Sequence, residues 1–418
     1  MSYKELSREV FLSSRIVIKA QVGGISSTNK IKDIKKRILD LINDCCFLEL
    51  DEYLFEFKEE IYYLNPKEIN EIIDASFFYA LIDASTEFYV SCLDQSIFDI
   101  LLITIHDLNE ENLIKFEKED FFFYIVSQIQ PSVSSPLEVL ANFCLLSEKS
   151  RDIILSIIQI SDIFDLINAS DTQHYLESLF SFLTSICYFN LPFELVEPIF
   201  LFMIDCFNYE KYQYCADYIY RGLLFCLSHE FVDLVIPDSI LVNMKDSIIN
   251  RHNMDAFFLF LSLIAHSCNN SNIQFLFECM LNDDKIYKHG CSFIHKLISN
   301  DQGFINQIID CQVVELMLDS MLNGTMRKKV VTLNLLMDLM VSLNNDMVFS
   351  TVIQQSLSLL DSADDEILKS VFAIILRYIQ FNSITSEEKS SISAQLSLIP
   401  VESAFFNKAC IIINMLKE

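Results

Sequence analysis

Apolar runs long enough to form buried helices recur along this chain at a nearly constant spacing. Eight of them align on a six-residue window, and successive windows start 33 to 43 residues apart. A spacing near 40 residues is typical of stacked helical repeats. The windows are Leu101–His106, Ala141–Leu146, Phe182–Cys187, Leu223–Ser228, Leu261–His266, Ile294–Ser299, Met337–Ser342 and Ile375–Gln380, with weaker units around Ile61–Asn65 and Cys410–Leu416.

The helices predicted at these windows are apolar on most sides. In Val330–Val341 the polar positions are only Thr332, Asn334 and Asp338. Such a helix must be covered by neighbours on most of its surface, as happens inside a repeat stack. Shorter amphipathic stretches such as Glu194–Cys206 lie between the apolar ones, so the pattern predicts an all-α fold of layered helices.

Polar clusters mark the predicted loops, and several place Asp or Ser just before a helix, as N-caps require. One interval is short: between Leu261 and Ile294 there is room for a single intervening helix, Asn272–Leu281. We expect that repeat to lack its small first helix. The clusters are Asn168–Asp171, Asn269–Ser271, Asn282–Asp284, Asn344–Asp346 and Ser362–Asp365.

Composition supports helices over strands, because the 418 residues include only 6 Gly and 7 Pro. Average usage is about 7% and about 5%, and hairpins and phosphate-binding loops depend on these residues. The 13 Cys residues lie mostly inside apolar runs, and the N-terminus shows no secretory pattern. We therefore expect small buried thiols in a reducing compartment, which favours a cytoplasmic and possibly nuclear protein.

Mean hydropathy of +0.32 requires a check for membrane spans, which need about 20 apolar residues. The apolar run from Ala256 reaches His266, Asn269 and Asn270 within a few turns, and the run from Ser178 stops at Pro192. Neither is expected to insert into a membrane.

The net charge of −28 is unevenly distributed. Residues 1–50 hold nine Lys/Arg and six Asp/Glu, whereas the remaining chain holds 21 and 52. An acidic body repels nucleic acid and anionic lipid, which need basic surfaces. The expected partner is therefore another protein, through a basic or extended segment.

The N-terminal region differs from the repeats. Residues 1–30 include Gly23-Gly24 and the polar run Ser26–Asn29, which predict a flexible arm ahead of an array spanning residues 31–418. Lys30–Asn43 then has the pattern of a basic amphipathic helix. We expect it to cap the first repeat, although a membrane surface or the acidic groove could also receive it.

Two segments resemble armadillo repeats. Pro136–Ile157 is similar to the third helix of an armadillo unit and the loop into the next, and Ile72–Asp107 follows the order of short first, second and long third helix. The resemblance to the armadillo/HEAT superfamily covers residues 50–418. It implies a right-handed α-α superhelix, an armadillo-type solenoid of about eight to ten repeats, with third helices lining a concave protein-binding groove.

Importin-α-like cargo receptors combine such a body with a basic arm, and their groove presents Trp and Asn on successive third helices. Here Asn142 matches that Asn, but Glu138 occupies the Trp position and the chain has no Trp. The usual Trp/Asn array is therefore absent. Other third helices place Leu183, Ser262, His295 and Asp338 where the Asn would fall.

The few polar positions of the predicted third helices are the candidate groove residues, in pairs about one turn apart. They could equally be solvated faces of buried helices. The candidates are Glu138 with Asn142, Glu177 with Ser181, Asp217 with Arg221, Ser262 with His266, Ser292 with Lys296, Asn334 with Asp338, and Arg377.

Signals for catalysis or cofactor binding are weak. His289, Cys291 and His295 include zinc-ligand residue types, but the two histidines are six residues apart and lie on different helix faces. No Gly-rich phosphate loop or nucleophile motif occurs. We therefore predict a non-enzymatic adaptor without cofactor or metal. The alternatives are an importin-α-like import receptor and a regulatory subunit that docks on a kinase or phosphatase.

Overall fold

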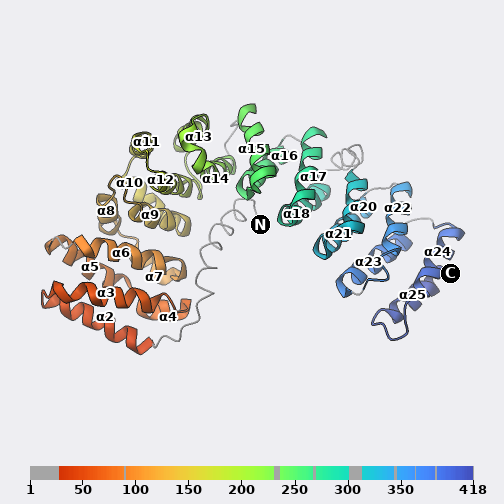
Figure 1. Cartoon of the computed structure of the whole chain (residues 1–418), viewed down its shortest axis with the longest axis horizontal. Helices are drawn as coiled ribbons and strands as arrows, with labels where there is room; N and C mark the ends of the chain where they lie inside the picture. The colour runs from red at the N-terminus through yellow and green to blue at the C-terminus, as the bar shows by residue number, and fades with distance from the viewer. Residues whose placement is uncertain are drawn as a thin grey trace. The chain divides into compact units, whose positions relative to one another are not determined.

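The computed structural model describes residues 28–88, 91–229, 236–266, 270–300, 313–342, 346–362, 364–381 and 384–417. These residues form 23 α-helices and two short 3-10 helices and contain no strand, which confirms the all-α prediction (Figure 1). The chain divides into two units, Met1–Asn243 (unit 1) and Met244–Glu418 (unit 2), which are described separately. Most of the predicted arm, residues 1–27, lies outside the described residues, and the first helix begins at Thr28.

Unit 1 contains helices α2 to α14 and the start of α15. Their bounds are α2 (Thr28–Asn43), α3 (Phe47–Ile61), α4 (Pro66–Ile72), α5 (Ala75–Phe88), α6 (Ser91–Thr104), η1 (Ile105–Asp107), α7 (Glu110–Phe116), α8 (Glu119–Ser127), α9 (Ser135–Leu146), α10 (Glu148–Ile157), α11 (Ile160–Ala169), α12 (Gln173–Ile186), α13 (Phe193–Phe207), η2 (Glu210–Cys215), α14 (Ala216–Leu227) and α15 (Asp238–Arg251).

Three successive sets in unit 1 have three helices each: α4–α5–α6, α7–α8–α9 and α10–α11–α12. The first helix is short, with seven residues in α4 and in α7. The two segments expected to resemble armadillo units match in part. Ile72–Asp107 contains α5 and α6 but only the last residue of the short helix α4, and the residues expected as a loop after the first helix of Pro136–Ile157 form α10. In the third set α10 is not shorter than α11, since both have ten residues. The helices α3, α6, α9, α12 and α14 pack each against the next, and we call them the third-helix row of unit 1.

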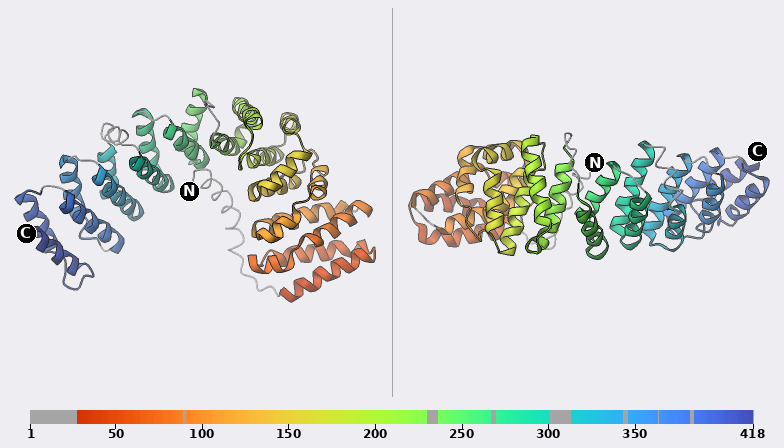
Figure 2. Two further views of the ribbon diagram at one scale, coloured as in Figure 1. Left: turned by 180° about the vertical axis from the view of Figure 1, so that it is seen from behind. Right: turned by 90° about the horizontal axis from the view of Figure 1, so that it is seen from above.

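Unit 2 contains α16 (Met254–His266), α17 (Asn270–Asn282), α18 (Asp284–Asn300), α20 (Val313–Asn323), α21 (Met326–Ser342), α22 (Asp346–Leu357), α23 (Asp365–Phe381), α24 (Ser386–Leu396) and α25 (Phe406–Lys417). Here α16, α18, α21, α23 and α25 pack in succession, and we call them the third-helix row of unit 2 by analogy with unit 1. A single described helix lies between each member and the next, so the two-helix spacing expected only between Leu261 and Ile294 recurs in the described part of unit 2. Figure 1 shows α17, α20 and α22 on the other side of that row, and Figure 2 shows the same order from behind and from above. The predicted helix Asn272–Leu281 is α17.

The eight apolar windows all fall on the third-helix rows, towards the C-terminal ends of α6, α9, α12, α14, α16, α18, α21 and α23. Many of the apolar side chains described there are buried where neighbouring helices meet, as are Leu183 and Leu223, which are 0% exposed. Polar side chains just before several helices act as caps. Asp283 accepts from two backbone amides at the start of α18 (2.6 and 3.1 Å), and Asp364 does so at the start of α23 (2.8 and 3.0 Å).

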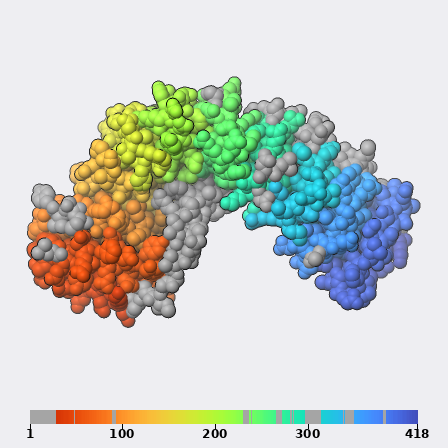
Figure 3. Space-filling view, viewed as in Figure 1, coloured from red at the N-terminus to blue at the C-terminus, as the bar shows by residue number. Residues whose placement is uncertain are grey.

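The basic helix α2 covers the N-terminal end of the unit 1 stack. Its apolar face is buried against α3, α4 and α5, and these helices form one continuous surface in Figure 3 (red to orange). Lys30 pairs with Glu60 at 2.6 Å and with Glu56 at 2.9 Å, and these hydrogen bonds raise the pKa of Lys30 to about 12. The contacts of α2 support the interpretation of this helix as a cap.

Two further expectations concern membranes and thiols. Within the described ranges, no helix is long and apolar enough to cross a membrane. Cys144, Cys187 and Cys226 are buried, as the apolar surroundings predicted.

Candidate protein-binding surface

The third-helix row of unit 1 carries a continuous set of polar side chains, which we call the polar strip. It begins on α3, where Lys58 pairs with Asp99 of α6 at 2.9 Å. Gln95 of α6 donates to Asp99 at 2.6 Å and to Ser135 of α9 at 3.3 Å. Three adjacent helices are thus joined through exposed or half-buried side chains.

His174 continues the strip from α9 to α12. Its Nε2 lies 3.1 Å from Ser134 Oγ and 3.8 Å from Glu138 Oε1, and its Nδ1 lies 3.9 Å from Glu177 Oε2. Ser178 donates to Glu138 at 3.1 Å. These contacts help to orient the carboxylates of Glu138 and Glu177. Both side chains remain accessible to solvent, with exposed fractions of 22% and 29%.

Acidic residues predominate along this row. The five helices hold eleven Asp/Glu and two Lys/Arg, none of them buried. Six of the eleven lie on α3, where Glu49, Glu56 and Glu60 pair with Arg37 and Lys30 of α2. The other four helices hold five Asp/Glu and one Arg, an excess of negative charge that attracts cations. The surface can therefore bind a positively charged ligand without forming a covalent bond.

The structure separates the predicted groove residues of unit 1 into two groups. Glu138, Glu177 and Arg221 are half-buried and Asp217 is exposed. Asn142 and Ser181 differ from the expectation, because they are 0% and 4% exposed and lie inside the packing of α9 and α12. Asn142 and Ser181 lie one helical turn after Glu138 and Glu177, at positions where the side chains already face the core. Neither side chain is therefore available to a partner.

In unit 2, Ser262 is half-buried, whereas Ser292, Lys296, Asn334 and Arg377 are exposed on the third-helix row. Asn334 accepts a hydrogen bond from Ser370 of α23 at 3.1 Å. The side chains of His266 and Asp338 lie outside the described part of the structure.

Sequence reasoning missed most of the strip, including Lys58, Gln95, Asp99, Ser134 and His174. A usable signal was present, since the paired residues are separated by one repeat. Ser134 and His174 are 40 residues apart, as are Gln95 and Ser135. A search for polar residues that recur at the repeat spacing would have found them.

A pocket of about 580 Å³ lies near the strip, between α5, α6 and α8. Asp94 and Asp120 supply carboxylates, and Phe123 is 63% exposed. Tyr124 donates to Asp94 at 2.6 Å, while burial and this bond raise the pKa of Tyr124. Carboxylates beside aromatic rings suit the ammonium or guanidinium group of Lys or Arg.

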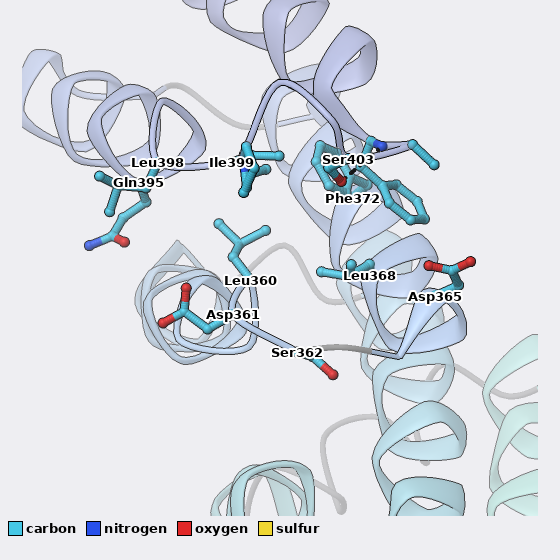
Figure 4. A pocket seen from close by; sticks show the side chains of 13 residues that line it. Leu360, Asp361, Ser362, Asp365, Leu368, Phe372, Gln395, Leu398, Ile399 and Ser403 are labelled. Carbon is cyan, nitrogen blue, oxygen red and sulfur yellow. Dashed lines mark hydrogen bonds between the residues drawn. The ribbon is translucent and has the colours of Figure 1, made fainter.

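A second pocket, of about 450 Å³, lies at the end of unit 2 (Figure 4). Leu360, Leu368 and Ile399 project into its centre, with Asp361 and Asp365 on opposite sides. The apolar centre of the pocket fits an apolar side chain.

Metal-binding residue types do not gather among the described residues, where no group of three His, Cys, Asp or Glu side chains could hold an ion. His289 packs edge-on against Phe258 at 5.3 Å. Burial, helped by the charge of Lys288, lowers the pKa of His289.

Comparisons with known proteins bear on the fold alone. No family model and no curated protein matches the chain. An engineered protein solved by the Northeast Structural Genomics Consortium is similar in structure, with a TM-score of 0.54 and 14% identity over 92% of this chain and 99% of that one. A second engineered protein from the same consortium is 13% identical over 61% of this chain and 96% of its own, and its TM-score of 0.27 carries no argument. The chain thus has an all-helical, repeat-like architecture of the α-solenoid kind.

Proposed function

We propose that this protein is a non-enzymatic adaptor that binds a basic, extended segment of another protein along the third-helix row of unit 1. The finer fold assignment, a right-handed armadillo-type superhelix, belongs to the same proposal. The three three-helix sets of unit 1 support it, two of them with a first helix of seven residues.

The observation that carries the proposal is the acidic polar strip. Its carboxylates lie on successive helices, and neighbouring packed helices are about 8–10 Å apart. An extended chain advances about 3.3 Å per residue, so a bound segment would present a basic residue to each helix at about every third position. The pocket at Asp94 and Asp120 offers an anchor for one such side chain.

Charge reversal on the strip tests this proposal. Glu138→Lys with Glu177→Lys should weaken binding of a fluorescein-labelled Lys-rich peptide about tenfold, since two attractions become repulsions of roughly 0.2–1 kcal/mol each. Fluorescence anisotropy at low and high salt measures the loss, and circular dichroism confirms folding.

The matched control is Glu197→Lys with Asp205→Lys on α13, which changes the net charge equally on exposed positions outside the third-helix row. We expect this control to bind within about twofold of the wild type. Equal losses in the two variants would show that only net charge matters and would overturn the proposal.

A further inference from the structure

The two layers of helices in unit 2 differ in their content of basic and acidic residues. The third-helix row α16, α18, α21, α23 and α25 holds ten Lys/Arg and five Asp/Glu, and none of the ten basic residues is buried. The other layer, α17, α20, α22 and α24, holds one Lys and six Asp/Glu. Unit 2 as a whole is acidic, with 13 Lys/Arg and 19 Asp/Glu, so the basic character belongs to one row.

The exposed faces of three of these helices carry the cations. On α18, buried Ile286, Tyr287 and Ile294 occupy one side, and the exposed Lys288 lies on the opposite side. On α23, buried Val371 and Ile375 occupy one side. The opposite side carries the exposed Lys369 and Arg377, together with the exposed Asp365 and Glu366 of the first turn. Arg327 on α21 is also exposed.

Contacts between the helices show that α18, α21 and α23 are direct neighbours. Lys328 of α21 lies over the ring of Tyr287 of α18, 5.5 Å from its centroid. Ser370 of α23 donates to Asn334 of α21 at 3.1 Å. The exposed cations therefore lie on three adjacent helices, and Lys288, Arg327 and Lys369 form no ion pair with any described carboxylate.

We infer that this basic row binds an acidic, extended segment of a partner protein, with Lys288, Arg327 and Lys369 as its contacts. This site is separate from the basic-segment site proposed for unit 1. The helix spacing of about 8–10 Å matches carboxylates at about every third residue of an extended chain. A nucleic acid suits the surface less well, because the acidic remainder of unit 2 repels a long polyanion.

The test uses the full chain and a labelled peptide of five Glu-Gly-Ser repeats. Lys288→Glu with Lys369→Glu should weaken its binding about tenfold in anisotropy at low salt. The control, Lys67→Glu with Lys389→Glu, makes the same charge change on α4 and α24 and should stay within twofold. A peptide with Gln in place of Glu should bind at least tenfold more weakly than the Glu peptide.

Three results would overturn the inference: equal losses in both variants, no measurable binding of the Glu peptide, or tighter binding of a single-stranded oligonucleotide than of the Glu peptide. The Lys-rich peptide separates this outcome from the function proposed above. It should bind the Lys288→Glu/Lys369→Glu variant at least as well as the wild type, so each site can fail without the other.

Discussion

The third-helix rows of the two units hold equivalent places in their repeats and carry opposite charge. In unit 1 the row has eleven acidic and two basic residues, and in unit 2 it has five and ten. The buried positions are similar, because both rows must pack a helix on either side. The exposed positions are free of that requirement. Their charge is therefore not set by the packing of the fold, and it is the property on which the two proposed binding sites depend.

The largest expected effect is the loss of stability when a buried aromatic ring of unit 1 is removed. The same variant tests whether unit 2 can bind its peptide without a folded unit 1. Phe143 is 0% exposed, with ring centroids 5.2 Å from Phe122 and 5.6 Å from Phe121. Phe143→Ala should lower the free energy of unfolding by about 3–5 kcal/mol, as measured by urea denaturation. The same change at Phe123, 63% exposed on α8, should cost less than about 0.5 kcal/mol.

Binding by the Phe143→Ala variant then sharpens the comparison. Repeats interact mainly with their neighbours, so the acidic peptide should still bind unit 2 within twofold under conditions that unfold unit 1. If the Lys-rich peptide and the Glu peptide lost affinity together, the two units would unfold as one cooperative unit, and the comparison of two separate rows would fail.

A smaller effect is expected at two glycines inside helices of the rows, Gly222 on α14 and Gly290 on α18. A Cβ at Gly222 would lie 2.3 Å from Met203 Cε and 3.1 Å from Thr184 Oγ1, and a Cβ at Gly290 would lie 2.5 Å from Met280 Sδ. Overpacking costs about 1–3 kcal/mol, against which alanine regains about 1 kcal/mol of helix propensity. We expect Gly222→Ala to destabilise more than Gly290→Ala in urea denaturation.

A double-mutant cycle identifies the cause. Combining Gly222→Ala with Met203→Ala should give a favourable coupling above about 0.5 kcal/mol, because the smaller side chain removes the collision. Additive effects would contradict the steric explanation.

The smallest expected effect is a loss of stability in acid, with one contributor in each unit. Burial alone would raise the pKa of Asp74, but hydrogen bonds from Lys35 and Ser76 outweigh it and lower that pKa. Hydrogen bonds from Tyr378 and from the Thr385 amide lower the pKa of Glu388. Both carboxylates stabilise the fold above the unfolded-state pKa of about 4, and this stability is lost as the pH falls below it.

Urea denaturation at pH 6 and pH 3 measures this loss. Asp74→Asn and Glu388→Gln should each reduce the acid-induced loss by about 1 kcal/mol or less, because both groups are partly exposed. Asp51→Asn on the exposed face of α3 serves as the control. An unchanged loss in the Asp74 and Glu388 variants would contradict the role of these hydrogen bonds.

The fold was predictable from the sequence because it depends on buried positions. The window Phe182–Cys187 had to lie in a covered helix, and it does. The surface was less predictable. Asn142 looked exposed because it is polar, yet the packing of α9 and α12 covers it. The charge of each row could not be predicted from the net charge of long segments. Successive helices alternate between two layers, so a sum along the chain mixes the charges of both layers.

Asn70 shows how unit 1 links one repeat to the next. Its amide nitrogen donates to the carbonyl of Asp107 at 2.5 Å, and its oxygen accepts from the Asn109 amide at 2.7 Å and from the Asn112 side chain at 3.1 Å. In a stack of repeats, hydrogen bonds of this kind between successive repeats limit how far one repeat can slide past the next. Because these hydrogen bonds oppose sliding between α4 and α7, we expect α6 and α9 beside them to keep a constant separation, which would give an extended ligand binding groups at regular intervals.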